Sequence, residues 1–186
     1  RFALKGLFAV FVVIFGFRSY ANYKSHPYLI PKTTGLAGSY GYYDVKQFKL
    51  NNALIPYSLT DTNRWQNVVF EKWATLSVKT AKPVKIDLSK ANGFFDNDID
   101  RRYEEAGAGG RLYYSYTADT VNHTLLLRNK NPHYSYDSLL LHYNRPDTST
   151  IILSGTNERR DSVSIVLNKV VKKYLFYIGR RQPVKL

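Results

Sequence analysis

The chain has 186 residues, and the part that follows the N-terminal apolar stretch suits one domain with a sizeable core. Cysteine is absent, which excludes a disulfide framework, thiolate chemistry and zinc–thiolate sites. The formal charge of +13 comes from scattered basic pairs without a long basic run or an RNA-binding motif, so it favours anionic lipid headgroups over nucleic acid.

An uncharged apolar run, GLFAVFVVIFGF, occupies residues 6–17. Twelve helical residues rise about 18 Å, short of the roughly 30 Å of a bilayer core, but the stretch from Phe2 to Tyr23 is long enough to span. Basic and aromatic residues follow the run up to Lys24, as at a membrane interface. We therefore predict a transmembrane helix over residues 1–24. Because the chain does not begin with Met, we expect it to be the last span of a truncated membrane protein.

Two other interpretations of this run remain open. Residues 19–21 resemble the cleavage site of a secretory signal peptide, although Arg18 directly before them argues against it. A buried core helix of a soluble protein has a similar run length. The basic residues on the two flanks nearly balance, slightly favouring a cytoplasmic domain. The expected location is the bacterial inner (cytoplasmic) membrane, as an integral protein.

The linker and the first strand come next. Residues 25–34 contain two prolines and no clear period, and we expect an extended linker. Residues 36–50 are rich in aromatic side chains, and their apolar phase changes between Val45 and Phe48, which predicts a long strand with a bulge. Residues 51–52, Asn-Asn, then turn the chain.

The middle of the chain is less regular. Residues 61–65 are polar and predict a helical turn capped by Asp61. Residues 66–79 and 84–88 predict the two strands of a hairpin, broken at a Lys-Pro pair. Residues 98–106, DIDRRYEEA, predict one short helix with acidic residues in its first turn.

From residue 111 onward, short alternating segments separated by polar turns predict an antiparallel meander. The predicted strands are residues 112–117, 121–128, 134–143, 150–154 and 162–168, with 170–178 as a further partner. The side chains expected to share one face are Val121, His123, Leu125 and Leu127 in one strand, and Val163, Ile165 and Leu167 in another. About nine strands and one short helix predict a mainly β fold, an antiparallel lipocalin-like β-barrel over residues 35–186.

An ordered set of short motifs carries a family resemblance. They are G-x-Y-x-x-x-x-F at residues 41–48, D-T-x-R-W at 61–65, V-V-F-E-K-W at 68–73, P-V-K-I-D-L at 83–88, T-L-L-L at 124–127, I-I-L-S-G at 151–155 and D-S-V-S-I-V-L-x-K at 161–169. With the preceding apolar helix, this order resembles the C-terminal part of the longer DoxX-family membrane proteins of Bacteroidetes-type bacteria. The resemblance implies an appended lipocalin-like domain, and an association of such proteins with quinone-linked redox complexes. It supplies no catalytic residue.

The sequence contains only weak candidates for catalytic or metal-binding motifs. Residues 96–100 open like a calcium loop, but Arg101 and Gly107 stand where an EF-hand needs Gly and Glu, so helix capping explains the carboxylates better. His123 and His142 lie in neighbouring predicted strands without a nearby carboxylate, which makes a poor metal site. We expect no cofactor, no metal and no catalytic residue, and the sequence leans towards a non-enzymatic role.

The aromatic side chains are the most suggestive feature, because a barrel of eight or more strands can hold one small ligand. The candidate cavity-lining residues are Tyr40, Tyr42, Phe48, Trp65, Phe70, Trp73, Tyr114 and Tyr116. The alternative is that they simply fill the core. The expected function is a membrane-anchored barrel that binds a small apolar molecule, such as a lipid or a quinone-like compound, or a partner subunit. The second hypothesis is an accessory subunit of a membrane redox complex. The expected partners are the lipid bilayer, a small apolar ligand or a membrane-protein subunit, and no nucleic acid.

Overall fold

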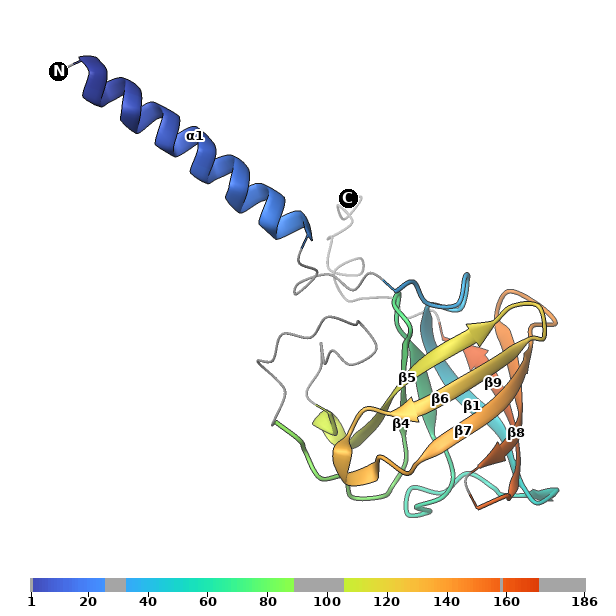
Figure 1. The fold of residues 1–186 in the computed structure, drawn as a ribbon. Helices are drawn as coiled ribbons and strands as arrows, with labels where there is room; N and C mark the ends of the chain where they lie inside the picture. The colour runs from blue at the N-terminus through green and yellow to red at the C-terminus, as the bar shows by residue number, and fades with distance from the viewer. Residues whose placement is uncertain (1, 26–32, 89–105, 158, 171–186) are drawn as a thin grey trace, which may run out of the picture.

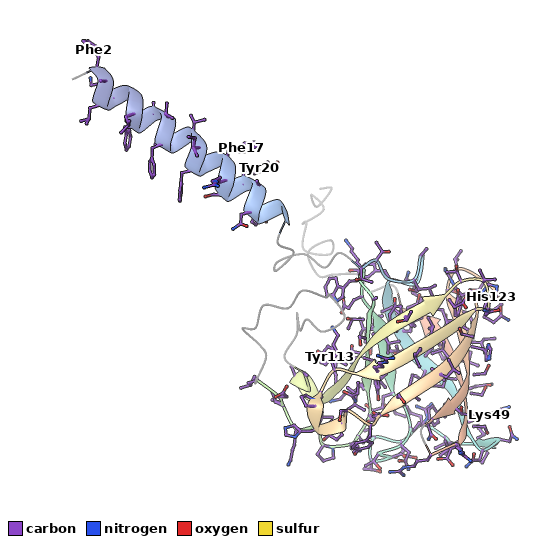
Figure 2. All side chains as sticks on the ribbon, viewed as in Figure 1. Phe2, Phe17, Tyr20, Lys49, Tyr113 and His123 are labelled. Carbon is purple, nitrogen blue, oxygen red and sulfur yellow. The ribbon has the colours of Figure 1, made fainter. Side chains whose placement is uncertain are left out.

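A computed structural model of the chain describes residues 2–25, 33–88, 106–157 and 159–170. Its first element is the 24-residue helix α1 (Phe2–Ser25), which stands apart from the barrel that follows it (Figure 1). The stretch Phe2–Tyr23 has a mean hydropathy of 1.8, and none of it is buried. Its apolar side chains point outward all round the helix (Figure 2). A buried core helix is therefore wrong for this segment, which is long and apolar enough to cross a bilayer.

The rest of the described chain is a closed antiparallel β-barrel (Figure 1). Its nine strands are β1 (Gly41–Leu50), β2 (Ala53–Leu54), β3 (Asn67–Phe70), β4 (Thr75–Lys79), β5 (Arg111–Asp119), β6 (Thr124–Asn129), β7 (Ser138–Asn144), β8 (Thr150–Asn157) and β9 (Ser162–Lys169). The sheet order is β2-β1-β3-β4-β5-β6-β7-β8-β9, and β1 also pairs with β9. Strand β1 and strands β3 to β9 thus form an eight-stranded wall, in which strands consecutive in sequence lie side by side. The short β2 only extends the sheet beside β1.

Strand β1 closes the barrel because it pairs with both β3 and β9. Its first half pairs with β3, and nearly its whole length pairs with β9. The register against β9 shifts between Val45 and Gln47, which confirms the predicted bulge, although the strand begins at Gly41 rather than at residue 36. The hairpin to β2 turns at Asn51 and Asn52, whose φ angles of 49° and 64° suit a two-residue turn that matches strand twist.

Alternation along the strands builds the interior. Strand β7 alternates strictly between exposed and buried residues, and β9 buries Val163, Ile165 and Leu167 as predicted. Leu125 and Leu127 of β6 are fully buried as well. Val121 and His123, expected on that same face, instead lie in the β5–β6 turn, where His123 has a φ of 52° and Val121 is 85% exposed.

One end of the barrel is closed by residues 33–39, at the top in Figure 1. Leu36 is buried in the core cluster, and its N–H donates to the Tyr116 hydroxyl over 2.8 Å. The Tyr43 hydroxyl donates to the Ser39 carbonyl over 2.7 Å. Arg145 holds the outer side of the segment, because its guanidinium donates to the carbonyls of Ala37 and Gly38 over 2.6 and 3.1 Å. We call this end the closed end.

Three predictions for the middle of the chain need correction or fall outside the described residues. Residues 66–79 form a hairpin of their own, β3 and β4, instead of one strand paired with 84–88, where Asp87 makes a single bridge to Ala106. A strand of fourteen residues would overrun the barrel, so the chain reverses at residues 71–74. Residues 61–65 form no helix. The short helix predicted for residues 98–106 lies outside the described residues, apart from Ala106.

Candidate ligand pocket at the open end of the barrel

A cavity of about 200 Å³ lies at the end opposite residues 33–39, which we call the open end. It is framed by the loops that follow β2, β4, β6 and β8. Its lining residues are Phe48, Leu50, Thr62, Asn63, Trp65, Thr80, Lys82, Leu112, Tyr114, Tyr134, Tyr136, Asp137, Leu139, Asn157, Arg159, Asp161 and Val163. Apolar and aromatic side chains of the wall form its floor, while charged and amide side chains from the loops form its rim. This division suits a ligand with an apolar body and a polar end.

The floor is an aromatic corner between β1 and the loop that precedes β3. The rings of Phe48 and Trp65 lie 6.4 Å apart between centroids, tilted by 40°. Tyr114 reaches the same space from β5. All three are buried, with 2–7% of their surface exposed. Together they form the floor of the pocket.

The rim is ordered by carboxylates that accept hydrogen bonds. The Tyr114 hydroxyl donates to Asp137 Oδ2 over 2.6 Å, and the Asn129 amide donates to the same oxygen over 3.1 Å. Asp161 accepts from the amides of Asn51 and Asn157 over 2.8 and 3.1 Å, and these bonds hold the pKa of its carboxyl below the usual value. Both carboxylates thus brace neighbouring loops.

Cations complete the rim. The Lys82 ammonium lies over the Tyr134 ring, 5.1 Å from its centroid. Arg159 is exposed in the β8–β9 turn, and its charge also lowers the pKa of Asp161. Charges of both signs therefore surround the entrance, and they can interact with the polar end of a ligand.

The loop between β2 and β3 carries Trp65 and is fixed by a buried arginine. Arg64 is 2% exposed, and its guanidinium donates to the carbonyls of Ile55, Trp65 and Val45. Asp61, expected to cap a helical turn, instead accepts from the N–H groups of Asn63 and Arg64 in a tight turn. The loop is therefore pinned to β1, and Trp65 keeps its place in the floor.

The structure divides the eight candidate aromatic residues into four groups. Phe48, Trp65 and Tyr114 line the pocket together. Phe70 and Tyr116 are buried in the closed half, with ring centroids 6.2 Å apart. Tyr40 and Tyr42 lie outside the core cluster, and Trp73 lies half-buried at the β3–β4 turn. Five of the eight thus share the interior, and three of these meet at the cavity.

Tyr43 is an interior aromatic residue that the sequence analysis missed. It is fully buried against Phe70, and burial raises the pKa of its hydroxyl, as it does for Tyr116. The sequence did contain a signal for this residue. Alternation of inward and outward side chains, counted backwards from the buried Val45, places Tyr43 inside the barrel and Tyr42 outside. Both phenols serve as hydrogen-bonding groups at the closed end, where the Tyr43 hydroxyl donates to Ser39 and the Tyr116 hydroxyl accepts from Leu36.

The histidines form no metal site in the described part of the chain, where no group of three or more His, Cys, Asp or Glu side chains is placed to hold an ion. His142 pairs with Thr124 across β6 and β7. His123 packs edge-on against the Tyr143 ring, 5.3 Å between centroids, at the closed end (Figure 2).

Fold and site together define a class: an eight-stranded up-and-down β-barrel with a small pocket at one end, preceded by an apolar helix long enough to span a membrane. Comparison of the chain with protein-family models, with curated proteins and with solved structures finds no match. The resemblance to the DoxX family and to lipocalins therefore stays a prediction from the sequence motifs.

Proposed function

We propose that this protein is a membrane-anchored binding protein, in which α1 spans the bilayer and the barrel binds a small molecule in the pocket at its open end. The observation that carries the proposal is the cavity of about 200 Å³ with an apolar floor and a polar rim. A barrel of eight strands has an interior just wide enough for side chains or for one small ligand. Here the closed half follows the first pattern and the open half leaves space for the second.

The anchoring part of the proposal is supported by the helix. It is apolar over 22 residues, it is not buried, and basic and aromatic residues follow its apolar run. An integral protein of the bacterial inner membrane with a DoxX-like N-terminal region fits these features. Sedimentation with membranes after an alkaline carbonate wash tests the anchor, and release by that wash would contradict it.

The binding part is tested with the two tryptophans of the chain. Trp65 lines the pocket and Trp73 does not, so subtracting the emission of a Trp65→Phe variant isolates the pocket signal. The full chain in detergent is titrated with hexanoate and with benzoate, which are small enough for the cavity. We expect a saturable change in Trp65 emission.

A pocket-filling variant sharpens this test. Val163→Phe adds a ring to the pocket wall and should weaken hexanoate binding at least tenfold, because it occupies the ligand's space. Val121→Phe, at an exposed turn of the closed end, is the matched control and should bind as the unmodified protein does. A linear, unsaturable response, or equal binding by both variants, would contradict a ligand role for this pocket.

The second function, an accessory subunit of a quinone-linked membrane complex, is favoured by the sequence resemblance. Purification from native membranes in mild detergent separates it from the first. A stoichiometric partner subunit would support it, and isolation of the chain alone at full yield would count against it.

A further inference from the structure

We propose that the pocket opens away from the bilayer and takes a water-soluble ligand of about one ring or a short chain from the aqueous phase. This inference rests on the proposed function, since it requires α1 to span and the pocket to bind. To the proposed function it adds the side from which the ligand enters the pocket and the class of ligand that the pocket takes.

The direction follows first from where the membrane tether joins the barrel. The tether consists of residues 26–32 and joins the barrel at Thr33. Backbone hydrogen bonds to the barrel begin at that residue. The Ala74 N–H donates to the Thr33 carbonyl over 3.2 Å, and the Gly35 N–H donates to the Lys72 carbonyl over 2.9 Å. Thr34 bridges to Trp73. The attachment point is thus fixed at the closed end, and the pocket lies at the opposite end of the same barrel.

The length of the tether sets how far the closed end can lie from the membrane. Eight residue steps separate Ser25, the last residue of α1, from Thr33. Such a chain spans roughly 28 Å when fully extended.

The height of the barrel is of similar size, and this decides the orientation. Strand β5 has nine residues, which corresponds to about 30 Å of strand and, at the usual tilt, to about 23 Å along the barrel axis. If the pocket faced the bilayer, the closed end would lie farther from the bilayer by the height of the barrel. The tether would then need nearly its full extended length to reach Thr33 along the side of the barrel. With the closed end facing the bilayer, the same eight steps bridge only the gap between Ser25 and the closed end. The second orientation therefore needs the shorter path.

The size of the pocket restricts the ligand in the same direction. A dry cavity of about 150 Å³ holds a benzene molecule, and sites for drug-sized ligands measure about 300–1,000 Å³. The 200 Å³ here suits a ring or a short chain with a polar end, and a whole lipid tail exceeds it. A molecule of this class dissolves in water and reaches the open end directly.

The absence of cysteine allows a direct test of orientation. Single cysteines are introduced at exposed positions in the full chain: Asn63→Cys at the open end, Ala37→Cys at the closed end, and Tyr20→Cys in α1 as the membrane reference. Each is labelled with a fluorophore and reconstituted into phosphatidylcholine vesicles that contain a headgroup nitroxide lipid. We expect the nitroxide to quench the closed-end label several-fold more than the open-end label. Equal or stronger quenching of the open-end label would overturn the inference.

The source of the ligand is tested on the same vesicles through Trp65. Hexanoate added to the water should change its emission saturably, whereas lipids with brominated acyl chains should leave it unquenched relative to the Trp65→Phe background. Quenching by the brominated lipid would show access from the bilayer and overturn the inference. The two proposals fail separately: loss of hexanoate binding in detergent removes the binding function, while reversed label quenching removes only the orientation.

Discussion

The Arg64 guanidinium donates from Nη2 to the Val45 carbonyl oxygen over 3.2 Å, at the point where β1 shifts its register against β9. A bulge leaves ladder groups without strand partners, and here a side chain nineteen positions further on satisfies one of them. Two further bonds join the same guanidinium to Ile55 and Trp65. Arg64 therefore couples the bend that closes the barrel to the loop that carries the pocket tryptophan.

Replacing this residue should be costly. Arg64→Ala removes three charge-assisted hydrogen bonds in a buried place, and we expect it to lower the free energy of unfolding by about 3 kcal/mol. Chemical denaturation followed by circular dichroism measures the change, and a red shift of Trp65 emission should accompany it. Arg128→Ala, at an exposed position of β6, is the control and should change stability by less than about 0.5 kcal/mol. Equal effects of the two variants would contradict the role given to Arg64.

Tyr116 should be needed to hold residues 33–39 over the closed end. Tyr116→Phe leaves the buried N–H of Leu36 without its hydroxyl acceptor, at a cost of about 1–3 kcal/mol. Hydrogen exchange at Leu36 should accelerate in the variant, while exchange in β8 should follow global stability alone. Tyr136→Phe, which changes an exposed hydroxyl, should leave the Leu36 amide as protected as before.

Gly155 should resist any larger residue. A Cβ atom at this position of β8 would overlap the carbonyl oxygen of Leu140 in β7, and neither backbone can retreat without breaking the ladder. We expect Gly155→Ala to destabilise the barrel by about 2–3 kcal/mol in thermal or chemical denaturation. The neighbouring exposed substitution Ser154→Ala should be nearly neutral, and a neutral result for both would show that the strands separate there without penalty.

Asp147 should make stability depend on acidic pH. Hydrogen bonds from the Ser149 hydroxyl and N–H, and from the Thr150 N–H, lower its pKa from 3.8 to about 2. Because the folded pKa lies below the unfolded one, its stabilising effect is complete above the unfolded value and is lost as pH falls from about 4 towards 2. The stability difference between the unmodified protein and Asp147→Ala should shrink over that window. A carboxyl titration by NMR with a midpoint near 3.8 would refute the bond pattern.

The barrel itself could be predicted from the sequence, because alternation is strong where one face of a strand meets the core. Strand β9 shows this best, since Val163, Ile165 and Leu167 are all buried. The bulge in β1 was visible as a change of apolar phase before Phe48. These are local patterns, and they need no knowledge of the partner strand.

The predictions that failed were those that depend on pairing between distant strands and on the height of the barrel. Residues 66–79 have the composition of one strand, and only the height of the wall explains why they fold back at Trp73. Among the aromatic candidates, side-chain type alone did not separate Tyr42 from Tyr43. The sequence named Phe48, Trp65 and Tyr114 among eight candidate cavity residues. It could not show which of the eight meet, because these three are brought together by closure between distant strands.

The way residues 33–39 join the barrel also determines how the protein bears mechanical load. A pull on the N-terminal helix reaches the barrel through bonds to the β3–β4 turn, to Tyr116 of β5 and to Arg145 beyond β7. These contacts lie on separate hairpins, so tension is shared among them in parallel and no strand is peeled from an edge one bond at a time. The junction is thus built to resist a pull that arrives along the chain from the N-terminal helix.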